Sequence, residues 1–263
     1  MQKIIRLFFI TNFFIFLLLI FQNGTAQTGT SIESAAHRLS ADEDSSRSIR
    51  IINASSLKRL PAVIRDLSAT LKESMFREWA HLGKNGLGIY LYDVTCKSVE
   101  KAACVRYQVN DSIYHVKIGS FNRQATDKAL AATLIHEIMH CVLLDIYSRA
   151  KREEEKAFRS IIHFGLNKND TSNFFNNDFF ALVNSGEAGQ HELIYQLFYP
   201  HMVSLLERFA EIHKDAFPDR RDAGHLMWSG LQKTSVYEKL SDEEKREIGQ
   251  TILEEKGIDI EEY

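Results

Sequence analysis

The stretch from Asp127 to Tyr147, DKALAATLIHEIMHCVLLDIY, contains the residues on which the predicted fold and chemistry depend. Its spacing predicts a helix in which His136 and His140, four residues apart, lie on one face. Two imidazoles at this spacing can bind one metal ion, and Glu137 lies beside them. His-Glu-x-x-His on a helix is the pattern in which two histidines bind zinc and the glutamate acts as general base to a zinc-activated water.

The neighbours of this motif are apolar on nearly all sides of the predicted helix, which is typical of a buried helix. These neighbours are Leu130, Ala131, Leu134, Ile135, Ile138, Met139, Val142 and Leu143. A glutamate in such a helix is unfavourable unless it is paired or coordinated. The alternative is two core histidines beside an exposed glutamate, and the apolar surroundings favour a metal site over it.

The N-terminus has the pattern of a signal peptide. Lys3 and Arg6 give a basic start, an apolar run extends from Leu7 to Phe21, and small residues up to Ala26 form a cleavage site. The run of about 15 residues is shorter than the roughly 20 that a membrane-spanning helix needs. We therefore predict a signal peptide at 1–26 and a secreted or periplasmic protein, with an uncleaved N-terminal anchor as the alternative.

The mature chain is expected to have no stable membrane span. Residues 27–50 are polar, serine-rich and without period, which predicts a flexible leader, and residues 51–263 can form a single domain. Cleavage removes two basic residues and takes the formal charge from −3 to −5. A mildly acidic chain without a basic block is not suited to nucleic acid, so no nucleic-acid partner is expected.

The predicted sheet lies just before the metal helix. Residues 56–82 have the apolar spacing of an amphipathic helix, and three strand-like runs follow at 88–94, 103–109 and 112–119. We expect a small antiparallel meander, whose last strand forms an edge to which an extended peptide substrate could add. The fold class is thus α+β, with further helices towards the C-terminus.

Two cysteines flank a short polar segment between two of these runs. In an oxidising compartment, Cys96 and Cys104 could close a structural disulfide. Cys141, inside the metal helix, is expected to be a small buried filler.

The C-terminal half returns to helical spacing. Residues 158–189 are expected to be a long excursion, partly helical near 178–183, that could border a cleft. A helix is predicted from His191 to Phe217, with Pro200 either kinking it or starting a second helix. The Ser241 start of a final helix carries a capping box.

A catalytic zinc takes three protein ligands and keeps an open position, so a third ligand must come from elsewhere. The sequence lacks the HExxHxxGxxH pattern, which excludes the metzincin arrangement. The candidates are His163, Glu187, His191, Glu192, His201, His213 and His225. We favour His191, because it is expected to open a helix after a glycine-bearing turn. Glu192 could hold a ligand in place or bind the metal instead of His191.

Three segments carry a resemblance to a known family. They are NRQATDKALAATLIHEIMHCVL (122–143), QHELIYQLFYPHMVSLLERF (190–209) and MWSGLQKTSVYEKLSDEEKREI (227–248). Together they resemble secreted zincin-like proteins of Bacteroidetes that are related in pattern to SprT-like metallopeptidases. The resemblance implies a zincin-like domain with His136, His140 and His191 as Zn²⁺ ligands and Glu137 as base. The chain departs from the family at Trp228-Ser229-Gly230, where two glycines are usual.

The function expected from these residues is that of a zinc-dependent metallopeptidase acting on a peptide or protein substrate. Glu137 is the expected general base, and Tyr195, Tyr199 and His201 are candidates to stabilise the oxyanion. One alternative is a catalytically silent zincin-like domain that binds a cell-envelope partner. Another is a zinc amidase that acts on cell-wall peptides.

Overall fold

The computed structural model describes residues 50–53, 55–73, 88–93, 103–108, 113–118, 124–151 and 179–256. All of them belong to one compact unit of the chain, residues 46–263. The predicted signal peptide, the leader up to residue 49, Cys96 and His163 lie outside the described residues.

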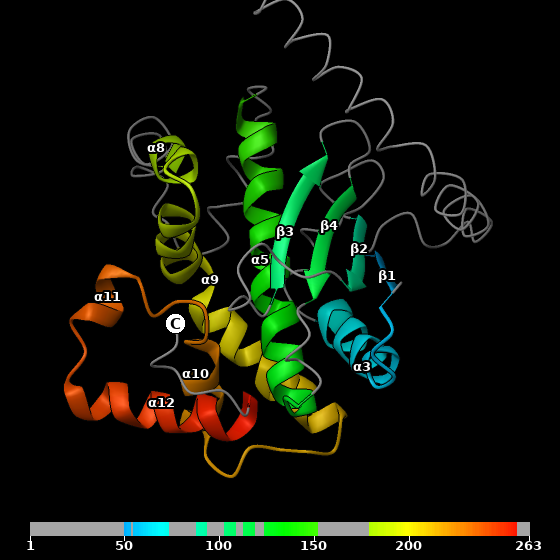
Figure 1. The fold of residues 1–263 in the computed structure, drawn as a ribbon, viewed down its shortest axis with the longest axis vertical. Coiled ribbons are helices and arrows are strands. Elements are labelled where there is room, and N and C mark those ends of the chain that lie inside the picture. The colour runs from blue at the N-terminus through cyan, green and yellow to red at the C-terminus, as the bar shows by residue number, and fades with distance from the viewer. Residues whose placement is uncertain are drawn as a thin grey trace, which may run out of the picture. The chain divides into compact units, whose positions relative to one another are not determined.

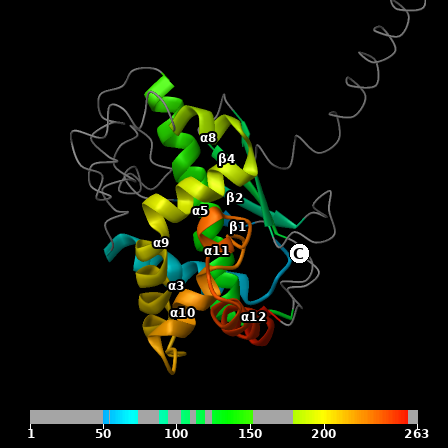
Figure 2. The same ribbon diagram turned by 90° about the vertical axis from the view of Figure 1, so that its left-hand side faces the viewer.

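The described chain is mostly helical, with a small sheet of four strands (Figures 1 and 2). The strands are β1 (Arg50–Asn53), β2 (Gly88–Asp93), β3 (Ala103–Gln108) and β4 (Ile113–Ile118). The three runs predicted before the metal helix are therefore strands, within one or two residues at their ends. Strand β1 has no counterpart among the predicted strands.

The predicted antiparallel meander is wrong. The strand order is β1-β2-β4-β3, with β1 parallel to β2, β2 parallel to β4, and only β3 antiparallel to its neighbour β4. The strand predicted as the edge, β4, is therefore internal, and β3 lies at the edge. Alternating apolar residues suit a parallel or an antiparallel partner equally, so the pattern by itself does not set the order.

Apolar side chains of β2 and β4 form one buried face of the sheet. Ile89 pairs in register with Tyr114 and Leu91 with Val116, and all four side chains are buried in the hydrophobic core. Side chains on successive strand residues point to opposite faces, so these alternate positions share one side of the sheet. This pairing places the two strands at the centre of the sheet.

Helix α5 (Asp127–Lys151) is the central helix of the domain and confirms that the predicted stretch 127–147 is helical. It contacts β3 of the sheet and also α9, so that every residue from 128 to 143 is buried (Figure 1). Within the described residues, one segment, Asp127–Ser148, is long and apolar enough to cross a membrane, and 89% of its window is buried inside the protein. Thr126 caps the helix, because its hydroxyl accepts a hydrogen bond from the Ala129 N–H at 3.1 Å.

The other described helices pack around α5. They are α3 (Leu60–Glu73), α8 (Phe180–Asn184), α9 (Glu187–Ile212), α10 (Arg220–Met227), α11 (Ser235–Glu238) and α12 (Asp242–Lys256). Helix α9 contacts α3, α5, α8 and α10, and α12 contacts α5 and α10. Helix α9 runs unbroken through Pro200, so a second helix does not start there. The capping box of α12 is present, with Ser241 and Glu244 bonded reciprocally.

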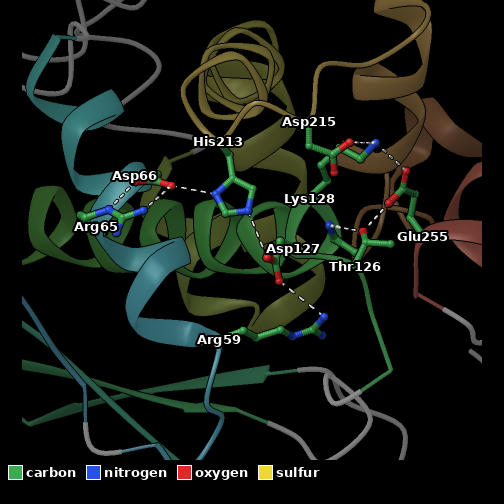
Figure 3. A network of polar contacts seen from close by, with 10 residues as sticks. Arg59, Arg65, Asp66, Thr126, Asp127, Lys128, His213, Asp215 and Glu255 are labelled. Atoms are coloured by element: carbon green, nitrogen blue, oxygen red, sulfur yellow. Dashed lines mark hydrogen bonds and ion pairs between the residues drawn. The ribbon is translucent and has the colours of Figure 1, made fainter.

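A network of polar contacts joins the ends of these helices (Figure 3). His213, at the end of α9, lies between Asp66 of α3 at 2.7 Å and Asp127 of α5 at 3.0 Å. Lys128 Nζ lies 3.4 Å from Asp215 and 3.2 Å from Glu255 of α12. These contacts tie α3, α9 and α12 to the first turn of α5.

Candidate metal centre

Three histidines meet between α5 and α9. His136 and His140 lie one turn apart on α5, and His191 comes from the second turn of α9. The Nε2 atom of His140 lies 3.1 Å from Nε2 of His136 and 3.2 Å from Nε2 of His191. The ring centroids are 4.9, 5.0 and 5.1 Å apart, so the rings form a nearly regular triangle. We refer to these residues as the three-histidine centre.

The three-histidine centre could hold a metal ion. Zinc binds imidazole nitrogen at about 2.0–2.1 Å, which in a tetrahedral site separates two ligand nitrogens by about 3.3 Å. The two Nε2 separations of 3.1 and 3.2 Å are close to this value. Imidazole donors suit zinc and also copper, iron and nickel.

A hydrogen bond prepares His140 to bind through Nε2. Its Nδ1–H donates to the side-chain oxygen of Gln190 at 3.0 Å. With the proton on Nδ1, the lone pair of Nε2 is directed at the other two histidines. Gln190 immediately precedes His191, so α9 supplies one candidate ligand and also the residue that orients another.

His136 is buried, with 6% of its surface exposed. Burial, together with the proximity of His140 and His191, lowers its pKa well below the usual 6.5. The neutral imidazole is the form that binds a metal. Within the described residues, its Nδ1 is buried without a hydrogen-bond partner, so the ring is held by packing.

Gly230 forms one wall of the centre, a role that its local sequence does not predict. Its φ of +91° is in the region that favours glycine, and a Cβ built there would lie 2.9 Å from Cε1 of His136. A side chain at position 230 would therefore push against the imidazole ring. The structure places the glycine of the segment Trp228-Ser229-Gly230 against His136.

Glu137 follows His136 on α5 and is 7% exposed. Thr133 and Cys141 lie one turn before and one turn after it, on the same face of the helix. Burial and the nearby Glu137 charge raise the pKa of Cys141 well above its usual value, so this thiol stays protonated, as expected of a buried filler. The expected base is therefore a buried residue that directly follows one histidine of the three-histidine centre.

His191 does not open its helix as predicted. Helix α9 begins at Glu187, after the N-cap Gly186, so His191 is four residues further along. The glycine-bearing turn does precede the helix, but one extra turn separates it from the histidine. That turn places His191 opposite the centre of α5, where it reaches His140.

Glu192, the alternative third ligand, turns away from the three-histidine centre. Its carboxylate accepts hydrogen bonds from the backbone N–H of Ser235 and, at 3.2 Å, from the Ser235 hydroxyl. Neighbouring residues of a helix point about 100° apart, so His191 and Glu192 cannot both face α5. Glu192 instead holds the start of α11 against α9.

The other described candidates are not in the three-histidine centre. Glu187 is exposed in the first turn of α9, and His201 is half-buried further along the same helix, where burial lowers its pKa. His213 is bonded to Asp66 and Asp127, and His225 lies 3.3 Å from the Thr251 hydroxyl.

Of the expected oxyanion donors, Tyr195 and Tyr199 belong to an aromatic cluster. Both rings pack on Trp228, with centroid distances of 4.9 and 5.1 Å. The Tyr199 hydroxyl donates to the carbonyl of Gly224 at 2.9 Å, and burial raises its pKa. The cluster links α9 to the turn that carries Gly230, and Tyr199 uses its proton there.

Comparison of the chain with models of protein families, with curated proteins and with solved structures gave no match.

Proposed function

We propose that this protein is a zinc-dependent peptidase with a zincin-like fold. The observation that carries the proposal is the convergence of three Nε2 atoms on one point, two from an HExxH helix and one from α9. Glu137, the expected base, directly follows His136 on that helix. Three neutral histidines leave a tetrahedral metal with an open position, which is typical of catalytic and not of structural zinc sites. The α+β architecture, with a sheet in contact with the HExxH helix, is compatible with a zincin-like domain.

The ligand set favours zinc, since three histidines with an adjacent carboxylate base form a known class of hydrolytic zinc centre. When bound, zinc supplies a Lewis acid that polarises a carbonyl and increases the acidity of water. His136, His140 and His191 would hold it. Glu137 would accept a proton from the attacking water and transfer it to the leaving amine, as a general base and then a general acid.

The N-terminal signal pattern supports the proposal that the peptidase acts outside the cytoplasm. A periplasmic or secreted enzyme has folded proteins, peptides and cell-wall peptides as available substrates. We take peptide bonds of peptides or proteins as the substrate class.

The decisive experiment combines metal content with hydrolysis. The purified mature chain is expected to contain about one zinc per chain and to cleave members of a peptide library. Glu137→Gln should keep the zinc and lose at least about a thousandfold in kcat, because the base is removed while the ligands remain. His191→Ala should lose both zinc and activity.

Full zinc binding by His191→Ala would overturn the ligand set. A wild-type protein that binds zinc but cleaves no peptide would overturn the peptidase proposal. If it cleaves cell-wall peptides instead, the amidase alternative replaces it. His225→Ala is the matched control, since this histidine lies outside the three-histidine centre and should keep both zinc and activity.

A further inference from the structure

Lys256, the last residue of α12, is a buried cation near the three-histidine centre. Its side chain is 6% exposed, and Nζ donates a hydrogen bond to the Thr133 hydroxyl at 3.1 Å. The Thr133 hydroxyl in turn donates to the carbonyl of Ala129 at 3.0 Å. Within the part of the chain that the structure describes, this hydroxyl is the hydrogen-bond acceptor of Nζ, and a buried ammonium is unfavourable unless an opposite charge is near.

Glu137 is placed to be that opposite charge. It lies four residues after Thr133 on α5, and residues at this spacing lie one above the other on the same face. Nζ of Lys256 is bonded at Thr133, one helical turn before Glu137, so the two charges can act on each other across this turn. Both side chains are buried, at 7% and 6% exposed, so their attraction is weakly screened.

The ionisation of Lys256 agrees with this arrangement. Burial is the larger effect and lowers its pKa to about 8, while the charge of Glu137 acts in the opposite direction. The Lys256 charge is also felt at His136, whose pKa it helps to lower. Lys256 is thus electrostatically linked to both Glu137 and the three-histidine centre.

The end of α12 is fixed in place on α5. Glu255, the residue before Lys256, accepts a backbone hydrogen bond from Thr126 at 2.7 Å through its carbonyl, and its carboxylate bonds the Thr126 hydroxyl. The same carboxylate pairs with Lys128 (Figure 3). These contacts hold the last turn of α12 against the first turn of α5 and direct Lys256 inward.

We infer that Lys256 is a positioning residue of the site, whose ammonium, bonded to Thr133 one helical turn before Glu137, attracts the Glu137 carboxylate and orients it beside the three-histidine centre. The C-terminal helix α12 thereby completes a site that the HExxH helix and α9 begin. The catalytic meaning of the pair rests on the proposed peptidase function, whereas the attraction itself does not.

A double-mutant cycle on stability tests the pair without reference to catalysis. Lys256→Met, Glu137→Gln and the double variant are compared with wild type by denaturant unfolding of the full mature chain in excess chelator, where metal binding contributes nothing. Each single variant should be destabilised, because it removes a buried countercharge. The folding equilibrium constant of the double variant should be about tenfold larger than the value obtained by multiplying the effects of the two single variants.

Lys128→Met provides the matched control. Lys128 is also a buried lysine of this region, at 8% exposed, but its partners are Asp215 and Glu255. In its cycle with Glu137→Gln, the effects of the two single variants on the folding equilibrium constant should multiply to within about twofold of the double variant. If Lys256→Met does not fold, Lys256→Gln is used in the same cycle.

Kinetics test the positioning role. In the zinc-loaded protein, Lys256→Met should lower kcat by about ten- to a hundredfold with KM changed less than about threefold, since the residue orients the base and does not bind substrate. A cycle without coupling overturns the pair, whether or not the protein is a peptidase. Coupling with unchanged kcat overturns the positioning role. A wild-type protein without any hydrolysis, but with a coupled cycle, overturns the proposed function and leaves the pair established.

Discussion

Gly230 packs against the imidazole of His136, so closely that a Cβ at position 230 would lie 2.9 Å from Cε1 and 3.2 Å from Nε2 of the ring. The two residues are 94 positions apart in the chain and meet because Trp228 anchors the turn of Gly230 to α9 through Tyr195 and Tyr199. His136 has no hydrogen bond at Nδ1 within the described residues, so this contact is part of what holds the ring.

Gly230→Ala should therefore disturb the metal centre. The new methyl group must displace His136 or the turn, and the φ of +91° adds backbone strain. We expect a loss of about 1–3 kcal/mol in the free energy of unfolding and at least about a tenfold loss of zinc affinity, measured by competition with a chelator.

Gly186→Ala is the control that separates backbone strain from the contact with His136. Gly186 has a similar φ of +89°, but a Cβ there would have no atom within 4 Å. It should lose stability by about the same amount and keep its zinc affinity. Equal zinc affinities for the two variants would show that the Gly230 contact with His136 has no role in metal binding.

Gln190→Ala should weaken zinc binding by about 10–100-fold without removing a ligand. The variant loses the acceptor that keeps the proton of His140 on Nδ1, so the tautomer with a free Nε2 is no longer favoured. Calorimetric titration with zinc measures the change. Gln196→Ala, at an exposed position of the same helix, is the control and should bind as wild type does.

Glu192→Ala should affect stability and not the metal. Its carboxylate bonds the N–H and hydroxyl of Ser235 at the start of α11, so its removal should cost about 1 kcal/mol in the free energy of unfolding. Ser235→Ala removes one of the two contacts and should cost less. A tenfold or greater loss of zinc affinity in Glu192→Ala would contradict the assignment of this residue to α11.

The ion pairs of His213 should make stability depend on pH. Burial lowers its pKa, but the hydrogen bonds to Asp66 and Asp127 outweigh burial, and the net pKa is raised above 6.5 (Figure 3). A raised pKa in the folded state means that the proton stabilises the fold, fully below about pH 6.5, and that this contribution is lost as pH rises through the raised value. The charges that face His213 also include Arg59 and Arg65, which pair with the two aspartates.

Asp66, an acidic residue of the same network, gives stability the opposite dependence on pH. The hydrogen bond from Arg65, and a smaller one from His213, lower the pKa of Asp66. Its contribution is present above about pH 3.8 and is lost as pH falls through the lowered value. His213→Gln should therefore lower the free energy of unfolding by about 1–2 kcal/mol near pH 5 and by much less near pH 9, as measured by urea unfolding. An equal loss at both pH values would contradict the charged pairing.

The sequence alone determined the elements that carry local signals. The apolar run around His136 and the Ser241 capping box predicted α5 and α12, because helix periodicity and capping act over a few residues. The spacing of His136 and His140 likewise fixed one face of the centre, since four residues make about one helical turn. The choice of His191 over Glu192 rested on local context, and the structure agrees by facing His191 to α5.

Only the tertiary structure decided what depends on contacts between distant segments. The order of the strands was set by which apolar faces pack on the core, and the alternating pattern of each strand does not encode its neighbour. Gly230 meets His136 across 94 positions of the chain, and Lys256 meets Thr133 across 123 positions, so the local sequence of neither residue indicates these contacts. The helix supplied the motif, but the walls and the buried countercharge of the site arise from the way α9, α10 and α12 pack around it.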